Sequence, residues 1–319
     1  MSSFRLTRAV TEHATHAALR ADVLDGLTHS PKTLPPKWFY DAVGSELFDR
    51  ITELPTYYPT AAEHACLAAR AAEIAAVTGA GTLVELGSGS LSEKSRQLLD
   101  ALPDLHTYIP VDVSESALTQ TGQTLGAERP DLSVHALIAD FTTGFTLPAT
   151  TGPRLIAFLG GTIGNLLPVE RTAFLSGVRA LMEPGDALLL GTDLVKDESV
   201  LVAAYDDPTT GAFNKNVLAV CNRALGADFD TDAFDHIALW NAHNEWIEMR
   251  LRSRTDQTVK IPELDLTVHF AEGEDLRTEI SAKFRWDRVY AELAAAALEL
   301  THWWTDPQAR FALSLSVAR

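Results

Sequence analysis

Long apolar runs are missing from this chain, and their absence sets the first limit on its function. No stretch of eighteen or more apolar residues occurs, so we expect no membrane-spanning helix. The opening residues, MSSFRLTRAVTEHATHAALRADV, are mixed polar and lack the continuous apolar core of a signal peptide. We therefore expect the protein to act in the cytoplasm.

Cysteine is also scarce. Only Cys66 and Cys221 occur, and they lie far apart in neither a CxxC nor a metal-binding spacing. We expect two free, buried thiols, as is typical of a reducing compartment. The histidines, among them His64, His243 and His302, likewise lack the spacing of metal ligands. The sequence therefore predicts a protein that needs no metal.

Positive charge is in deficit, because 26 Lys and Arg face 43 Asp and Glu for a formal net charge of −17. A nucleic-acid-binding protein needs a basic face to displace counterions, so this balance argues against nucleic acid as a partner. It also weighs against binding to anionic membranes. An acidic protein tolerates a cationic or zwitterionic small substrate, although charge alone selects none.

The 319 residues suit two domains, or one large α/β domain with an added lobe. Short apolar runs in the middle of the chain alternate with helical patterns, which predicts a parallel sheet covered on both faces. The expected strands are Thr82–Leu86, His106–Val111, Leu132–Ala139, Leu155–Leu159 and Ala187–Leu190. The expected helices of this region are Glu63–Val77, Glu93–Ala101, Glu115–Gly126 and Val169–Met182.

The pattern changes near Asp193. We expect a helix over Asp197–Leu225, a second over Asp232–Ala242, and then an antiparallel meander. After a helix at 286–297, the stretches LELTHWWTD and FALSLSVA should return two strands to the main sheet. The predicted fold is therefore a Rossmann-like α/β domain, 61–195 plus 284–319. A discontinuous α+β substrate-binding domain, 1–60 plus 196–283, should accompany it.

The strongest local signal is the stretch from Leu83 to Ser90, where an apolar strand breaks into the glycines Gly87 and Gly89 just before a helix. Glycine permits a tight turn and lets a ligand approach the backbone. Ser92 stands where a dinucleotide fingerprint has its third glycine, which disfavours a nicotinamide oxidoreductase. We interpret the turn as a site for S-adenosylmethionine, whose ammonium Glu85 would hold.

Two further acidic residues follow strands of the same predicted sheet. Asp112 ends the second strand, where a carboxylate should meet ribose hydroxyls. Asp140 ends the next strand, where it would accept from the adenine amino group, with Phe141 flanking the ring. Each aspartate alone reads more simply as a helix cap or a turn residue. Acids at three successive strand ends favour an adenosyl site.

Many motifs of the chain resemble the L-histidine Nα-methyltransferase family of actinobacteria, which makes hercynine in ergothioneine biosynthesis. They cover nearly the whole chain: PPKWFYDAVGSELFD (35–49), LPTYYPT (54–60), TLVELGSG (82–89), SEK (92–94), GGTIGNL (160–166), LLLGTDLVKD (188–197), AYDD (204–207), AFNKNVLAV (212–220), TEISAKF (278–284) and THWWTDP (301–307). One departure is that GSGSLSEK is one residue longer than the family's GSGTSEK, with Leu91 as the extra residue. The resemblance implies a class I methyltransferase sheet and an enzyme, expected to be a monomer.

The resemblance also implies the site residues. The implied cofactor site consists of Tyr40, Gly87, Lys94, Asp112, Asp140, Phe141, Gly160 and Thr162. The implied L-histidine site consists of Tyr57, Asn165, Tyr205, Glu279 and Ser281. Tyr40 and Asn165 are the implied catalytic residues, which would aim the substrate amine. Asn165 and Tyr205 would hold the substrate carboxylate and amine, and the remaining three would face the imidazole.

Simpler interpretations and other functions stay open at this point. Tyr57 reads equally well as part of a packed aromatic turn, Asn165 as a left-handed turn residue, and Glu279 as a solvated strand residue. A methyltransferase for another amino acid or small amine is the first alternative, and Glu279 and Ser281 discriminate against it, because an apolar pocket would lack them. A non-catalytic adenosyl-binding protein is the second alternative, and the presence of Asn165 and Tyr205 argues against it.

Overall fold

The fold is described from a computed structural model, which covers residues 4–9 and 11–319. Contacts divide these residues into two compact units, each built from separate stretches of the chain. The first unit contains residues 4–9, Pro59–Val195 and Lys283–Arg319, and the second contains Thr11–Tyr58 and Lys196–Ala282. Residues 1–3 and 10, which the sequence analysis assigned to the second domain, lie outside the described residues.

The first unit is built on an eight-stranded sheet in the order β1-β5-β4-β3-β6-β7-β14-β13. The strands are β1 (Phe4–Arg8), β3 (Thr82–Leu86), β4 (Thr107–Asp112), β5 (Ser133–Ile138), β6 (Arg154–Phe158), β7 (Ala187–Asp193), β13 (Leu298–Thr305) and β14 (Phe311–Ala318). The first six in the sheet order run parallel, and β14 pairs antiparallel with both β7 and β13. The prediction that two tail strands return to the main sheet is confirmed.

Helices connect these strands, as expected for a Rossmann-like domain. They are α3 (Tyr58–Thr78), α4 (Glu93–Ala101), α5 (Glu115–Glu128), the 3-10 turn η2 (Thr162–Asn165), α6 (Pro168–Leu181) and α9 (Trp286–Ala295). Apolar residues of α3 and α4 pack with strands of the sheet in one buried cluster. The strands themselves are near-continuous apolar runs because both faces of a parallel sheet are covered. The α/β fold class is confirmed.

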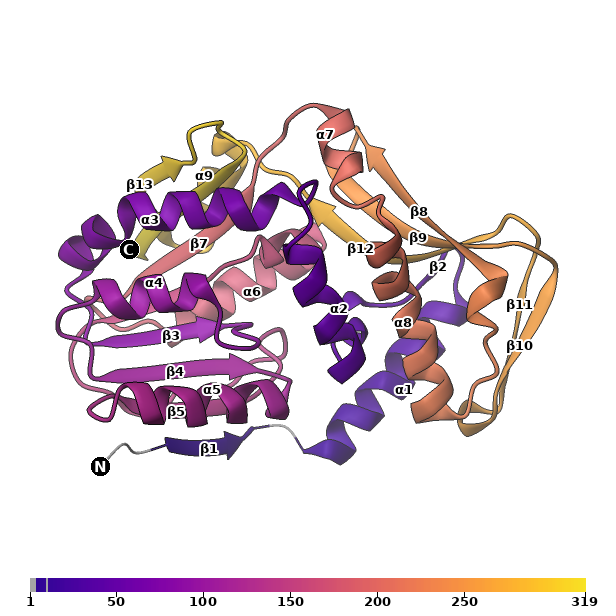
Figure 1. Ribbon diagram of the computed structural model, residues 1–319, viewed down its shortest axis with the longest axis horizontal. Helices are drawn as coiled ribbons and strands as arrows, with labels where there is room; N and C mark the ends of the chain where they lie inside the picture. The colour runs from indigo at the N-terminus through magenta and orange to yellow at the C-terminus, as the bar shows by residue number, and fades with distance from the viewer. Residues whose placement is uncertain (1–3, 10) are drawn as a thin grey trace. The chain divides into compact units, whose positions relative to one another are not determined.

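The N-terminal strand corrects the expected domain boundary. Residues 1–60 were assigned to the second domain, but β1 (Phe4–Arg8) pairs in parallel with β5 at the edge of the large sheet (Figure 1). Its Phe4 ring packs against Gly122 of α5. The segment is short and mostly exposed, with only Phe4 and Leu6 apolar, so its pairing with β5 is what reveals it as a strand.

The second unit contains a four-stranded sheet in the order β2-β12-β9-β8 and a separate hairpin of β10 and β11. Its strands are β2 (Lys32–Thr33), β8 (Phe234–Asn241), β9 (Trp246–Ser253), β10 (Gln257–Ile261), β11 (Leu266–Phe270) and β12 (Asp275–Ala282). Its helices and 3-10 turns are α1 (Glu12–Thr28), η1 (Pro36–Phe39), α2 (Ala42–Thr52), α7 (Glu198–Ala203), α8 (Pro208–Leu225), η3 (Thr231–Ala233) and η4 (Pro262–Leu264). They share one apolar core, as an α+β unit requires.

Two expectations for this unit are wrong. The helix expected over Asp232–Ala242 is the strand β8, because pairing with β9 along its full length overrides the weak helical pattern. The single helix expected over Asp197–Leu225 is interrupted between α7 and α8. Pro208 has no amide hydrogen and disfavours helix in the residue before it, so a new helix starts there, capped by Asp207.

The thiols and the helix lengths of the chain can be compared with what the sequence predicts. Cys66 and Cys221 are free and buried, as expected, and burial raises the pKa of each thiol to about 12. In the part of the chain that the structure describes, no helix is both long and apolar enough to cross a bilayer.

Candidate active site

The glycine turn after β3 brings together Gly87 and Phe141. Gly87 has a φ of +65°, and its amide donates to the Val111 carbonyl at 2.8 Å. A Cβ atom at Gly87 would lie 3.3 Å from Cε1 of Phe141. Both the backbone conformation and the close approach of the ring therefore favour glycine at this position.

Asp112 lies at the end of β4 and faces the same turn. Its carboxylate accepts from the Gly89 amide and from the Ser114 amide, each at 2.8 Å. Burial raises the pKa of Asp112, while these backbone donors act in the opposite direction. The structure thus places an acceptor beside the glycine turn, where the sequence predicts a ribose-binding carboxylate.

Asp140 and Phe141 follow β5, the next strand of the sheet. Asp140 Oδ1 accepts from the Thr142 amide at 2.9 Å, and the Phe141 ring packs edge-on to Phe158 at 5.2 Å between ring centroids. Because β3, β4 and β5 are parallel neighbours, their carboxyl ends meet at one edge of the sheet. The structure therefore gathers Gly87, Asp112 and Asp140 there.

Lys94, Gly160 and Thr162 form a second group at this edge, with Glu63 at its centre. Glu63 Oε1 accepts from the Gly160 amide at 2.6 Å, and Oε2 lies 3.6 Å from Nζ of Lys94. A Cβ at Gly160, whose φ is +77°, would lie 3.0 Å from Lys94 Nζ and 3.4 Å from Thr162 Oγ1. The extra residue Leu91 precedes α4 and leaves Lys94 within this group.

Glu63 was not among the site residues expected from the sequence, yet its side chain is only 2% exposed. It lies in the Ala-rich helix α3, where a glutamate usually faces solvent, so no local pattern distinguishes it. Its two contacts come from residues about 30 and 100 positions away, which only the fold brings together.

Glu85, expected to hold the ligand's ammonium, lies buried beneath the glycine turn. Its side chain is 1% exposed and accepts from the Ser95 hydroxyl at 2.9 Å and from the Tyr108 hydroxyl at 2.6 Å. Burial raises the pKa of this carboxyl. Both oxygens thus accept hydrogen bonds within the core of the first unit.

The second unit brings together most of the residues expected to bind histidine. The Tyr205 hydroxyl lies 2.8 Å from Ser281 Oγ, and the Tyr57 and Tyr205 rings are 6.0 Å apart, edge to face. Glu279 and Ser281 pair with Met249 and Ile247 of β9 and so point to one face of the sheet. Glu279, Ser281 and Tyr205 are all buried.

Tyr40 and Asn165 each belong to the other unit from most residues of their expected site. Tyr40 was expected in the cofactor site, and Asn165 in the histidine site. Tyr40 belongs to the second unit, where its 36% exposed ring packs edge-on to Phe48 at 5.5 Å and to Phe213 at 5.3 Å. Asn165 belongs to the first unit and is the last residue of η2. The two expected catalytic residues thus come from different units.

The first unit offers what an adenosyl ligand needs. Gly87 forms a tight turn at the strand end, Asp112 and Asp140 present acceptors, and Phe141 supplies an aromatic face. These residues fit S-adenosylmethionine, which supplies an electrophilic methyl group on a sulfonium. Among residues 4–9 and 11–319, no three His, Cys, Asp or Glu side chains are grouped as metal ligands.

Known methyltransferases are similar to this chain over nearly its whole length. A family profile described as histidine-specific, S-adenosylmethionine-dependent methyltransferase matches residues 19–318. A Mycolicibacterium smegmatis protein named histidine N-alpha-methyltransferase is 57% identical over 305 residues, covering 94% of this chain and 95% of the relative. A Mycobacterium tuberculosis protein of the same name is 54% identical, covering 96% of both chains.

Other methyltransferases are similar to this chain at lower identity. A Psilocybe serbica L-tryptophan methyltransferase is 27% identical, covering 92% of this chain and 91% of that protein. The solved CcbJ methyltransferase of Streptomyces caelestis is 15% identical with a TM-score of 0.45, covering 78% of this chain and 94% of that one.

The family match spans nearly the full length of the chain and includes both sets of expected site residues. This chain is an enzyme that belongs to the family of histidine-specific, S-adenosylmethionine-dependent methyltransferases.

Proposed function

We propose that this enzyme transfers three methyl groups from S-adenosylmethionine to the α-amine of L-histidine. The product would be hercynine, and the reaction would be the first step of ergothioneine biosynthesis. The observation that carries the proposal is the 57% identity to a histidine N-alpha-methyltransferase over 94% of the chain. A Neurospora crassa protein named ergothioneine biosynthesis protein 1, 31% identical over 61% of this chain, supports the pathway. We propose a monomer acting in the cytoplasm.

In this proposal the first unit holds the methyl donor. Gly87, Asp112, Asp140 and Phe141 would contact its adenosyl part, and the group around Lys94 would contact the rest, together with Gly160 and Thr162. Their arrangement at one edge of the sheet supports this assignment, because ligands of open parallel sheets bind at the carboxyl ends of strands.

The second unit would recognise the imidazole ring. A buried Glu279 is an acceptor for a ring N–H, and Ser281 can meet the other ring nitrogen. The hydrogen bond between Ser281 and Tyr205 would hold both hydroxyls in one orientation, with Tyr57 beside them. Asn165 and Tyr205 would bind the carboxylate and the amine.

The chemistry requires a neutral amine aligned with the methyl group. A free α-amine loses its proton near pH ~8, so Tyr40 and Asn165 need only aim it rather than act as strong bases. Each transfer leaves an ammonium that must lose a proton before the next. The aromatic faces of Tyr57 and Tyr205 can accept the growing cation without a formal counterion.

The test is an incubation of the purified enzyme with isotope-labelled S-adenosylmethionine and an equimolar pool of the twenty amino acids. Product masses should show the label in histidine alone. Label in another amino acid, such as tryptophan, would instead support the alternative of a methyltransferase for a different amino acid. A protein that binds the cofactor tightly and labels nothing would support a non-catalytic role.

A further inference from the structure

A β-bulge interrupts β12 just before Glu279. Arg277 pairs with Arg250, whereas Glu279, two residues later, pairs with Met249, only one residue further along β9. Thr278 is therefore the extra residue of the bulge. Bulges shift every following side chain to the opposite face of a strand.

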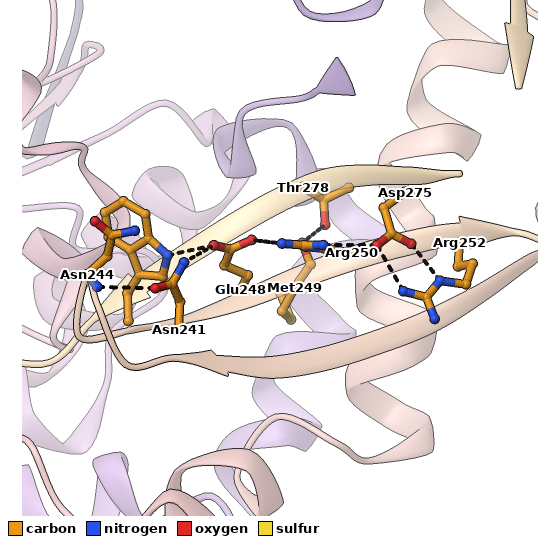
Figure 2. A network of polar contacts seen from close by, with 9 residues as sticks. Asn241, Asn244, Glu248, Met249, Arg250, Arg252, Asp275 and Thr278 are labelled. Carbon is orange, nitrogen blue, oxygen red and sulfur yellow. Dashed lines mark hydrogen bonds and ion pairs between the residues drawn. The ribbon is translucent and has the colours of Figure 1, made fainter. Parts of the chain in front are cut away.

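The shift decides which way Glu279 points. If the pairing continued without a bulge, Glu279 would oppose Glu248 on the face that carries a row of hydrogen bonds and ion pairs. Figure 2 shows this row along β9, from Asn241 through Glu248, Arg250 and Asp275 to Arg252. With the bulge, Glu279 and Ser281 lie on the face of Ile247 and Met249, which is the face that packs into the apolar core of the unit.

Two buried polar side chains hold the bulge. The Thr278 hydroxyl donates to Asn214 Oδ1 of helix α8. It also lies 3.0 Å from the Met249 carbonyl oxygen (Figure 2). Asn214 Nδ2 lies 3.1 Å from the Arg250 carbonyl oxygen. Asn214 is fully buried and Thr278 is 1% exposed. The two side chains thus contact the backbone of β9 directly opposite the extra residue.

The same asparagine connects the bulge to Tyr205. Asn214 Nδ2 lies 2.9 Å from His236 Nδ1, and His236 Nε2 lies 2.9 Å from the Tyr205 carbonyl oxygen. A carbonyl oxygen only accepts, so Nε2 carries the proton and Nδ1 accepts from the amide. Because the Tyr205 hydroxyl contacts Ser281, the chain of contacts returns to β12.

We propose that Thr278 and Asn214 are positioning residues that hold the bulge and so direct Glu279 and Ser281 toward the substrate. His236 extends this control to the backbone of Tyr205. The inference rests on the proposed function, in which these residues bind histidine. Neither Thr278 nor Asn214 is required to touch the substrate.

The test compares Thr278→Val, which keeps the shape of the side chain but removes the hydroxyl, with Thr278→Ser, which restores it. Ser253→Ala is the matched control, because Ser253 is a buried hydroxyl in the same sheet that donates to a backbone carbonyl, that of Thr255. KM and kcat for histidine are measured together with the affinity for S-adenosylmethionine. Amide hydrogen exchange of residues 275–282 reports on the bulge without any substrate.

We expect Thr278→Val to raise KM for histidine about tenfold, with kcat and cofactor affinity unchanged within about twofold. Exchange over residues 275–282 should become faster in Thr278→Val only, and Thr278→Ser should recover both values. Unchanged exchange and KM in Thr278→Val, or an equal rise of KM in Ser253→Ala, would overturn the inference. If exchange responds as expected but the wild-type enzyme methylates no histidine, the positioning role stands and the proposed function fails.

Discussion

The hydrogen bond between Tyr205 and Ser281, in the proposed histidine site, should contribute measurably to the free energy of unfolding. We predict that Tyr205→Phe and Ser281→Ala are coupled in their effects on the free energy of unfolding. Both side chains are buried, and their oxygens lie 2.8 Å apart. A hydrogen bond between neutral groups contributes a net ~0.5–1.5 kcal/mol, so a coupling energy of about 1 kcal/mol is expected.

The assay is urea unfolding of the wild type, the two single variants and the double variant, followed by tyrosine and tryptophan fluorescence. The control cycle combines Ser281→Ala with Ser253→Ala. Ser281 pairs with Ile247, six residues along β9 from Ser253, a separation of roughly 20 Å. These two substitutions should therefore be additive.

A coupling below about 0.3 kcal/mol for Tyr205 and Ser281 would refute this reasoning, because distant sites already add to within that error. It would mean that the two hydroxyls do not bond in solution. The preorganised frame assigned to the imidazole would then be absent, and the binding roles of both residues would need revision.

Three other predictions concern backbone strain and buried ionisable groups. Gly87→Ala should weaken the affinity for S-adenosylmethionine about tenfold, because an alanine in the left-handed conformation costs ~1–2 kcal/mol and its Cβ would press on Phe141. Calorimetry that shows unchanged affinity would contradict this. Burial raises the pKa of Glu85 above its ordinary 4.5, so the wild type loses stability as the pH rises through the folded-state pKa. Urea unfolding measured from about pH 4 to about pH 8 should show that Glu85→Gln removes this loss. Burial lowers the pKa of His236 below its ordinary 6.5, so the wild type loses stability as the pH falls from 6.5 through the folded-state pKa. An equally steep loss of stability in His236→Gln would show that another group is responsible.

The parallel sheet and its strand ends were predictable from the sequence. Near-continuous apolar runs separated by helical patterns specify a covered parallel sheet, and Gly87, Asp112 and Asp140 each follow one of its strands. Strand-end position is a local property of the chain, so a reader of the sequence can place all three at one edge.

Features that depend on pairing were not predictable. The pattern of β8 is weak, and its pairing with β9 alone makes it a strand. The bulge at Thr278 leaves no mark in the alternation of residues, since both faces of β12 are buried around it. Glu279 and Ser281 share a face because they lie two residues apart on one strand, but which face they share is set by the bulge.

Single carboxylates were the least predictable residues. Glu85 follows the pattern of a ligand-binding acid, yet Ser95 and Tyr108 engage it in the core. Glu63 follows the pattern of a surface helix residue, yet it contacts Gly160 and Lys94. In both cases the direction of one side chain depends on residues distant in sequence, which composition and spacing do not report.

We propose that one enzyme places all three methyl groups on the α-amine of histidine, and analysis of its product is the direct test. The enzyme is incubated with histidine and excess S-adenosylmethionine, and the product is analysed by mass spectrometry with fragmentation. We expect a product with three methyl groups on the α-nitrogen and an unmodified imidazole. Methylation of the ring, or a product that stops at one methyl group despite excess cofactor, would contradict it.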